Sequence, residues 1–212
     1  MKQLLITLSI VFALTACTEH KPTTGLYLLL DTSGTYTKEL KKAQQIINYY
    51  LAQLEPGDSF AVARIDSGSF SETDIIAKVT FDHRPSRANE QKRVFSATIS
   101  QFIETVKSSA YTDISGGILL AKEYLNETGA DKKFIMVFSD MQEELPKGYK
   151  RDFELSLPDY EVIALNVTKL RSDNQDPAQY MQRLKDWQQR IEQSGGKWRM
   201  INDLEREQSL AL

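Results

Sequence analysis

Oxygen-bearing side chains cluster at three places where an apolar run or a polar loop ends. Asp31, Ser33 and Thr35 stand at alternate positions in LLLDTSGT, Thr112 lies in SAYTDISGG, and Asp140 ends FIMVFSD. Carboxylates and hydroxyls are hard oxygen donors, which suit Mg²⁺, Mn²⁺ or Ca²⁺ and not Zn²⁺. A second interpretation is that these residues only form turns and cap helices, because Asp, Ser and Thr are favoured there too.

The polar clusters follow elements that the apolar pattern predicts. Runs apolar on both faces indicate buried strands, and recurrence every three to four residues indicates helices packed on a core. Strands are expected at Gly25–Leu30, Ser59–Asp66, Asp74–Phe81, Lys132–Asp140, Tyr160–Val167 and Lys197–Asn202. Helices are expected at Thr37–Leu54, Phe95–Val106 and Ile114–Asn126, from the Asp176-Pro177 cap to Gly195-Gly196, and at Leu204–Leu212.

This order of elements predicts an α/β fold. Strands that alternate with helices form a mostly parallel sheet with helices on both faces, and Gly25–Leu30 should be its central strand. The polar turn around Gly68 joins two successive strands and indicates a hairpin, which gives one antiparallel edge strand. Ligands of such sheets bind beyond the carboxyl ends of the strands. All three polar clusters are expected at that edge.

Together the clusters resemble the metal-ion-dependent adhesion site of von Willebrand factor type A (VWA) domains. Asp31-x-Ser33-x-Thr35 is similar to the D-x-S-x-S signature of that family. Thr112 resembles the threonine that the family supplies from a second loop, and Asp140 follows a VFS strand end as the family's aspartate does. The resemblance rests on all three clusters occurring in order at the expected element ends.

The resemblance covers nearly the whole chain after its first residues, from about Gly25 to Leu204. The stretch Leu54–Asp58 also looks like the family's turn between its first helix and second strand. Two positions depart from the pattern: Thr35 replaces the commoner serine and keeps the hydroxyl, and Ser115 stands where many members have glycine. The second departure leaves the path of the threonine loop open.

The resemblance implies a Rossmann-like VWA domain in which all five side chains hold a divalent cation. Mg²⁺ is the expected ion, with Mn²⁺ or Ca²⁺ as alternatives. Neutral hydroxyls do not neutralise the ion, so it keeps positive character toward an open position that a partner protein's carboxylate can fill. The two aspartates act directly or through water. Asp113, Glu143 and Glu144 are expected nearby and would make the rim acidic.

The first residues have the pattern of a secretory signal peptide. In MKQLLITLSIVFALTAC, Lys2 precedes the apolar stretch Leu4–Leu14, and small residues precede Cys17. The end of this stretch, LTAC, resembles the lipobox of bacterial lipoproteins, whose cysteine is lipidated and becomes the first mature residue. Cys17 is the only cysteine, which excludes an internal disulfide and a multi-cysteine zinc site. The alternative is a buried free thiol.

We therefore expect a signal peptide at 1–16, a lipidated tether at 17–24 and a single VWA domain at 25–212. A lipid anchor attaches a protein to a bilayer without making it span the membrane. Thr18 follows the cysteine where lipoproteins retained at the inner membrane often carry Asp. By this resemblance we expect the bacterial outer membrane, with the domain facing the periplasm.

Composition excludes several function classes. The net charge of -3 and a pI near 5.5 argue against nucleic-acid binding, which needs a basic surface. The chain has only His20 and His83, and neither is a persuasive partner for a nucleophilic serine, so an enzyme is not expected. A metal-assisted hydrolase and a metal-independent assembly factor are the alternatives to a protein that binds its partner through a cation.

Replacing Cys17 tests the expected lipid anchor. Cys17→Ser should abolish fatty-acid incorporation and lipoprotein processing, because the modified thiol is gone. Metabolic labelling with a fatty acid measures the incorporation, the size of the protein on a gel measures the processing, and a serine replacement at Thr18 provides a control that should still be labelled and processed. Equal labelling of the wild type and Cys17→Ser would contradict lipidation at this residue.

Overall fold

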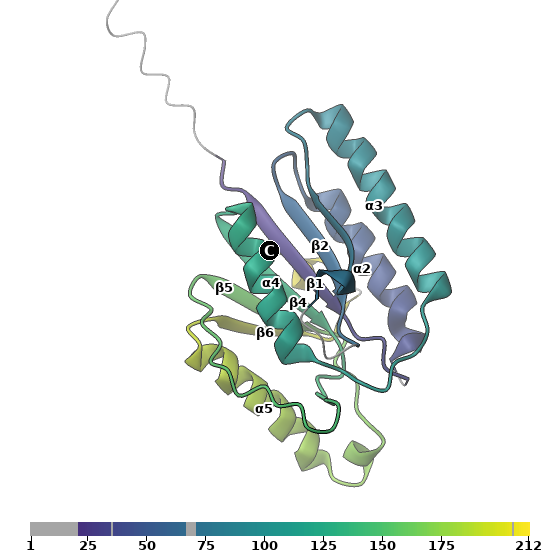
Figure 1. The fold of residues 1–212 in the computed structure, drawn as a ribbon, viewed down its shortest axis with the longest axis vertical. Helices are drawn as coiled ribbons and strands as arrows, with labels where there is room; N and C mark the ends of the chain where they lie inside the picture. Colours follow the sequence, from purple (N-terminus) through teal and green to yellow (C-terminus); the bar gives the residue numbers. More distant parts are fainter. Residues whose placement is uncertain (1–20, 35, 67–70, 205) are drawn as a thin grey trace, which may run out of the picture.

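A six-stranded sheet forms the centre of the computed structural model, which describes residues 21–34, 36–66, 71–204 and 206–212. The strand order is β3-β2-β1-β4-β5-β6, and every pair is parallel except β2 with β3 (Figure 1). The predicted α/β fold with one antiparallel edge strand is thereby confirmed. The strands are β1 (Thr24–Leu30), β2 (Ser59–Arg64), β3 (Ile75–Thr80), β4 (Lys132–Phe138), β5 (Tyr160–Leu165) and β6 (Lys197–Ile201).

Helices cover both faces of the sheet. On one face lie α2 (Leu40–Gln53) and α3 (Pro85–Thr105), and on the other lie α4 (Ile114–Thr128) and α5 (Pro177–Gln193) (Figure 1). The alternation of side chains along β1 explains why both layers are needed. Leu26, Leu28 and Leu30 belong to the core under α2 and α3, whereas Tyr27 and Leu29 belong to the core under α4 and α5. The central strand is therefore apolar on both faces, as its sequence predicted.

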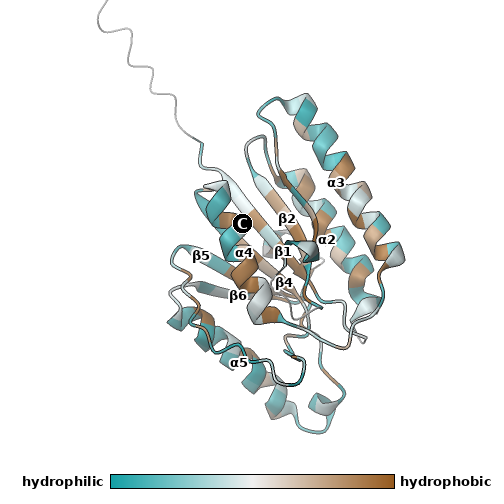
Figure 2. Cartoon of the chain, in the orientation of Figure 1, coloured by the Kyte–Doolittle hydropathy of each residue, from teal (hydrophilic) through white to brown (hydrophobic). Residues whose placement is uncertain are grey.

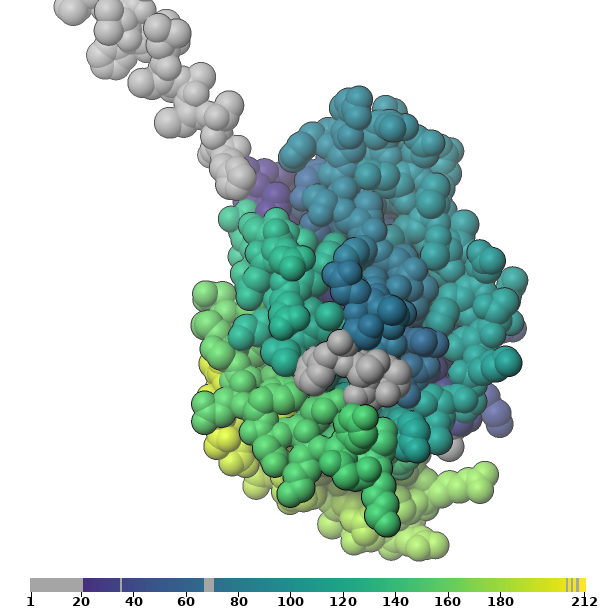
Figure 3. All heavy atoms as spheres, in the orientation of Figure 1, coloured from purple at the N-terminus to yellow at the C-terminus, as the bar shows by residue number. Residues whose placement is uncertain are grey.

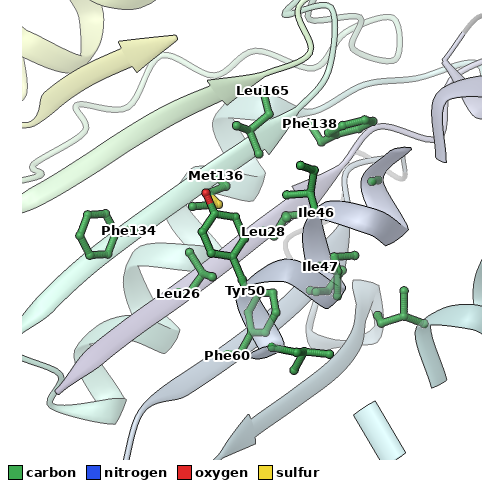
Figure 4. Packing of buried hydrophobic residues seen from close by; sticks show 14 of the residues in the cluster. Leu26, Leu28, Ile46, Ile47, Tyr50, Phe60, Phe134, Met136, Phe138 and Leu165 are labelled. Carbon is green, nitrogen blue, oxygen red and sulfur yellow. The ribbon is translucent and has the colours of Figure 1, made fainter. Parts of the chain in front are cut away.

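The packing of α2 shows how one face is filled. Ile46, Ile47 and Tyr50 of this helix lie against Leu26 and Leu28 of the sheet (Figure 4). Colouring by hydropathy shows brown, apolar stretches on the central strands and a mixture of teal and brown along the helices (Figure 2), and the buried apolar residues of each helix face the two cores. The helices thus bury one stripe each and leave polar residues outside, which is the pattern that sequence periodicity predicts.

Several predicted boundaries differ from the observed ones. Thr24, assigned to the tether, is the first residue of β1, because it pairs with Lys132 of β4. The predicted terminal helix is wrong for 206–212, the part of this segment that the structure describes without a gap, where a 3-10 turn forms at Glu207–Leu210. A short isolated helix is unstable without packing, and Leu210 is the position that anchors this segment, through burial and a 3.0 Å hydrogen bond from the Tyr50 hydroxyl to its carbonyl.

The hairpin prediction is confirmed in its strands, whereas its turn around Gly68 lies in 67–70, outside the described residues. Val106, predicted as helical, is the extended residue directly after α3. In the described part of the chain, no helix has the length and apolar character that crossing a membrane requires.

Candidate metal centre

The three predicted clusters meet at the carboxyl edge of the sheet. β1 and β4 are neighbours whose last residues, Leu30 and Phe138, are paired, so the chain leaves both strands at the same edge. One further hydrogen bond joins the two segments beyond the paired residues: the Asp31 N–H donates to the Phe138 carbonyl at 3.0 Å. The cluster around Thr112 lies in the loop between α3 and α4, and it is held beside the end of β2, where the Asp113 N–H donates to the carbonyl of Ile65 at 2.9 Å.

Backbone hydrogen bonds tie the threonine loop to the other two clusters. The Ser109 N–H donates to the carbonyl of Thr32 at 2.9 Å, beside a bridge between Ser33 and Ser109. Thr112 and Glu144 exchange both of their backbone hydrogen bonds, at 2.8 and 2.9 Å. These bonds fix the position of the Thr112 backbone along the sheet edge, so that its hydroxyl lies beside Asp31 at the end of β1.

Asp31 is the most heavily bonded side chain of the centre. It is 1 % exposed, and its Oδ1 accepts from the Ser33 N–H at 2.8 Å. Its Oδ2 accepts from the Ser139 hydroxyl at 2.6 Å, and the Thr112 hydroxyl lies 3.5 Å from Oδ1. The bond to Ser33 is an Asx-type turn, in which a side chain orders the backbone two residues on.

Asp140 contributes the second carboxylate. It is 4 % exposed, and its Oδ1 accepts from the Gln142 N–H at 2.9 Å. Burial raises the pKa of Asp140 to about 6, the N–H of Gln142 opposes the shift, and the charge of Asp31 adds to it. The centre therefore brings together two buried carboxyl groups, and the negative charge of Asp31 disfavours that of Asp140, while the positive charge of Arg183 favours it.

Within the described residues, neither carboxylate forms an ion pair with a lysine or arginine side chain. Buried charges are normally paired or coordinate a metal. No group of three or more His, Cys, Asp and Glu suited to a metal occurs in the described part of the chain, and the candidate set accordingly depends on hydroxyls beside its carboxylates. These oxygen donors fit a magnesium-type cation.

The predicted site residues are brought together as far as they are described. Asp31, Thr112 and Asp140 are buried at one edge, and Ser33 is half-buried beside them. Thr35, the remaining member of the signature, lies outside the described residues, as does the predicted lipidation site Cys17. The metal-binding role of the five residues and the lipidation of Cys17 stay predictions.

The expected acidic rim is wrong for Asp113. This residue is 4 % exposed, caps α4 by accepting from the Gly116 N–H at 2.8 Å, and forms an ion pair with Arg151. Glu143 accepts from the Ser115 N–H at 2.7 Å, so its carboxylate is also engaged at the start of α4. The charges serve the local helix start, where a carboxylate is favourable, rather than an open acidic surface.

Ser139 and Met141 are site residues that the sequence analysis missed. The Ser139 hydroxyl donates to Asp31 and accepts from the Met141 N–H at 3.0 Å, so it links the ends of β1 and β4. Met141 is fully buried with φ 65, a left-handed conformation that costs about 1–2 kcal/mol outside glycine. Such strain persists only where the surrounding contacts hold it. The serine in VFSD, directly before the aspartate, was the available signal.

Solved structures with the same fold include VWA proteins. The chain matches the von Willebrand factor type A protein from Catenulispora acidiphila with a TM-score of 0.57 and 13% identity, over 87% of this chain and 40% of that one. It matches the pilus adhesin SpaC from Lactobacillus rhamnosus GG with a TM-score of 0.51 and 12% identity, over 91% of this chain and 29% of that one. No protein-family model and no curated protein matches the sequence.

These likenesses show the fold. The chain has the Rossmann-like von Willebrand factor type A fold, which the sequence motif predicted. It spans less than half the length of either matched protein, and at this identity nothing beyond the fold follows from them. An aerotolerance-related membrane protein from Bacteroides fragilis matches 85% of this chain at 15% identity, but its TM-score of 0.46 is too low to support an argument.

Replacing Ser139 tests the link between the two strand ends. Ser139→Ala should lower the free energy of unfolding by about 1–3 kcal/mol, because the Met141 N–H is left buried without an acceptor and Asp31 loses a donor. Denaturant unfolding in the presence of a chelator measures this cost without any metal contribution. The exposed Ser86→Ala, as a matched control, should stay within about 0.5 kcal/mol of the wild type. Equal stability of Ser139→Ala and the control would contradict the link.

Proposed function

We propose that this chain binds a partner protein through a divalent cation held at the candidate metal centre. The observation that carries the proposal is the pair of buried carboxylates, Asp31 and Asp140, which lie at one sheet edge with no lysine or arginine ion pair in the described part of the chain. A cation there compensates both charges and removes their mutual repulsion. Mg²⁺ is the proposed ion, and Mn²⁺ can replace it.

The hydroxyl groups give the proposed site its binding chemistry. The proposed ligands include neutral oxygens from Ser33, Thr35 and Thr112 and negative oxygens from the two aspartates. Because three of the five ligands are neutral, the site does not add an excess of negative charge around the cation. The cation therefore keeps an attraction for one further anionic ligand. A carboxylate on the surface of the partner is the ligand of matching chemistry. The chain acts by binding in this proposal, and no step of catalysis is assigned to it.

The SpaC match gives limited support to a protein-binding role, since that protein is a pilus adhesin with the same fold. The competing proposal is a structural or assembly factor that uses a metal-independent surface. The two proposals differ in a single respect that can be measured, namely whether removing the cation removes the partner.

The geometry of the fold suits an anchored protein. The chain enters β1 at Thr24, and Asp31 follows the opposite end of this strand, about 23 Å away at the usual rise of about 3.3 Å per residue. A chain anchored ahead of Thr24 would therefore leave the edge that carries the metal centre free. We propose that the protein is a lipoprotein of the bacterial envelope that presents this edge to its partner, with the outer membrane as the proposed location.

Metal-dependent stability is the first test of the proposed site. An ion that binds only the folded chain raises stability by about 2.7 kcal/mol at a hundredfold excess over its dissociation constant, or roughly 5–10 °C in melting temperature. Asp140→Asn should lose most of this shift. The matched control is Asp159→Asn, which changes an exposed carboxylate directly before β5, at the other edge of the sheet. Melting curves of the wild type that do not respond to Mg²⁺ or Mn²⁺ would count against an occupied site.

Partner capture tests the function itself. The immobilised domain should retain an envelope protein when Mg²⁺ is present and release it with chelator, and Ser33→Ala/Thr35→Ala should fail to retain it although the variant is folded. The matched control is Ser86→Ala/Thr105→Ala, which removes two exposed hydroxyls on α3. A partner held equally with chelator and by both double variants would reject cation-dependent recognition and favour the assembly factor.

A further inference from the structure

Helix α5 contacts the backbone directly after β4 through two side chains. The Arg183 Nε–H donates to the carbonyl of Asp140 at 3.1 Å, and the Trp187 Nε1–H donates to the carbonyl of Met141 at 2.9 Å. The two donors are four residues apart and therefore lie on one side of the helix. Trp187 is buried in the core, and its ring nitrogen also holds the loop that carries the predicted metal ligand Asp140.

Arg183 is itself held in place by a buried carboxylate. Its Nη1 and Nη2 donate to the two oxygens of Asp173 at 3.2 and 2.7 Å, and the side chain of Asp173 is fully buried. The Asp173 Oδ2 also accepts from the Leu170 N–H at 2.8 Å, and the hydrogen bonds from Arg183 hold the pKa of Asp173 below its ordinary value. All three guanidinium nitrogens are thus engaged, which fixes the direction of the Nε–H toward Asp140.

The backbone that these donors hold is strained. Met141 has φ 65, and its relaxation would rotate the peptide that joins it to Asp140. Its N–H is bonded to Ser139 on one side and its carbonyl to Trp187 on the other. Two donors from α5 at consecutive carbonyls therefore oppose the movement that would displace the Asp140 carboxylate.

The same side of α5 reaches the threonine loop. Arg190, three residues after Trp187, donates from Nη1 to the Ser115 hydroxyl at 2.6 Å and from Nη2 to the Arg151 carbonyl at 3.4 Å. Arg151 in turn pairs with Asp113, the residue directly after Thr112. In the space-filling view the loop after β4, in green, fills the surface between α4 and the yellow-green α5 (Figure 3). We name Arg183, Trp187 and Arg190 the α5 stripe.

We propose that the α5 stripe positions the ligands of the metal centre: Arg183 and Trp187 fix Asp140, and Arg190 fixes the helix start beside Thr112. The residues of the stripe are positioning residues, since they contact the ligand-bearing backbone and not the ion. This inference rests on the proposed function, and it deepens it by naming what sets the affinity for the cation. Hydrogen-bond partners that orient metal ligands typically change affinity by about 10- to 100-fold when replaced.

Conservative replacements test the proposal without leaving a buried charge alone. Arg183→Lys keeps a positive charge beside Asp173, but a single ammonium group cannot serve both that carboxylate and the Asp140 carbonyl. Trp187→Phe keeps an aromatic ring and removes the donor to Met141. Each variant should bind Mn²⁺ about 10- to 100-fold more weakly than the wild type in calorimetric titration.

Matched controls come from β6. Arg199→Lys changes an arginine whose ion pair with Glu161 joins β6 to β5, and Trp198→Phe changes the neighbouring, partly buried tryptophan. Both controls should bind Mn²⁺ within a factor of about two of the wild type. Titration of folded protein, verified by circular dichroism, separates a positioning effect from a general loss of structure. Wild-type affinity in both Arg183→Lys and Trp187→Phe would overturn the proposal.

Hydrogen exchange of the metal-free protein gives a second readout. The amides of Met141 and Gln142, bonded to Ser139 and Asp140, should exchange faster in Arg183→Lys and Trp187→Phe, whereas those within β4 should not. Unchanged exchange at both amides would contradict the positioning role. Should the wild type bind neither Mn²⁺ nor Mg²⁺, the proposed function fails, and the exchange data alone then decide whether α5 fixes this loop.

Discussion

The burial of the Asp31 carboxylate at the end of the central strand is the constraint on which the site depends. A charge removed from water must be met by donors or by a cation, and Asp31 receives a backbone N–H from its own loop and a hydroxyl from Ser139, directly after the neighbouring strand β4. These donors and the Thr112 hydroxyl are neutral, so the negative charge is oriented but not cancelled. The second buried carboxylate, Asp140, increases the demand for a positive ligand.

The sheet makes this arrangement possible because parallel neighbours end at the same edge. Because the register pairs Leu30 with Phe138, the next residues, Asp31 and Ser139, lie side by side. The apolar layers on both faces then exclude water from the strand ends, which strengthens every interaction there. The burial that stabilises the fold thus also removes the carboxylates of Asp31 and Asp140 from water, and the proposed cation compensates their negative charge.

The sequence predicted the parts of the site that follow local rules. Asp31 and Asp140 could be placed because each directly follows a strand and Thr112 because it lies in the loop just before a predicted helix, and the carboxyl ends of parallel strands share one edge. The donors from α5 could not be predicted, since Arg183 lies 43 residues from Asp140 in the sequence. Helical periodicity predicts which side of a helix is buried, but it does not predict the hydrogen-bond partner of a polar side chain at the edge of that side. Asp113 was assigned to the rim for a related reason: its partner lies in a loop without periodic pattern.

The buried ion pair between Arg183 and Asp173 is best understood through what it orients. Such a pair adds little stability on average, because the cost of removing both charges from water offsets their attraction, and apolar residues of similar size often serve equally well. An apolar side chain at position 183 could fill the space, but it could not donate to the carbonyl of Asp140. Asp173 keeps the guanidinium in the single direction that makes this donation possible. The ion pair therefore serves to orient Arg183, which holds the strained loop after β4. That loop positions the Asp140 carboxylate, which the proposed cation requires.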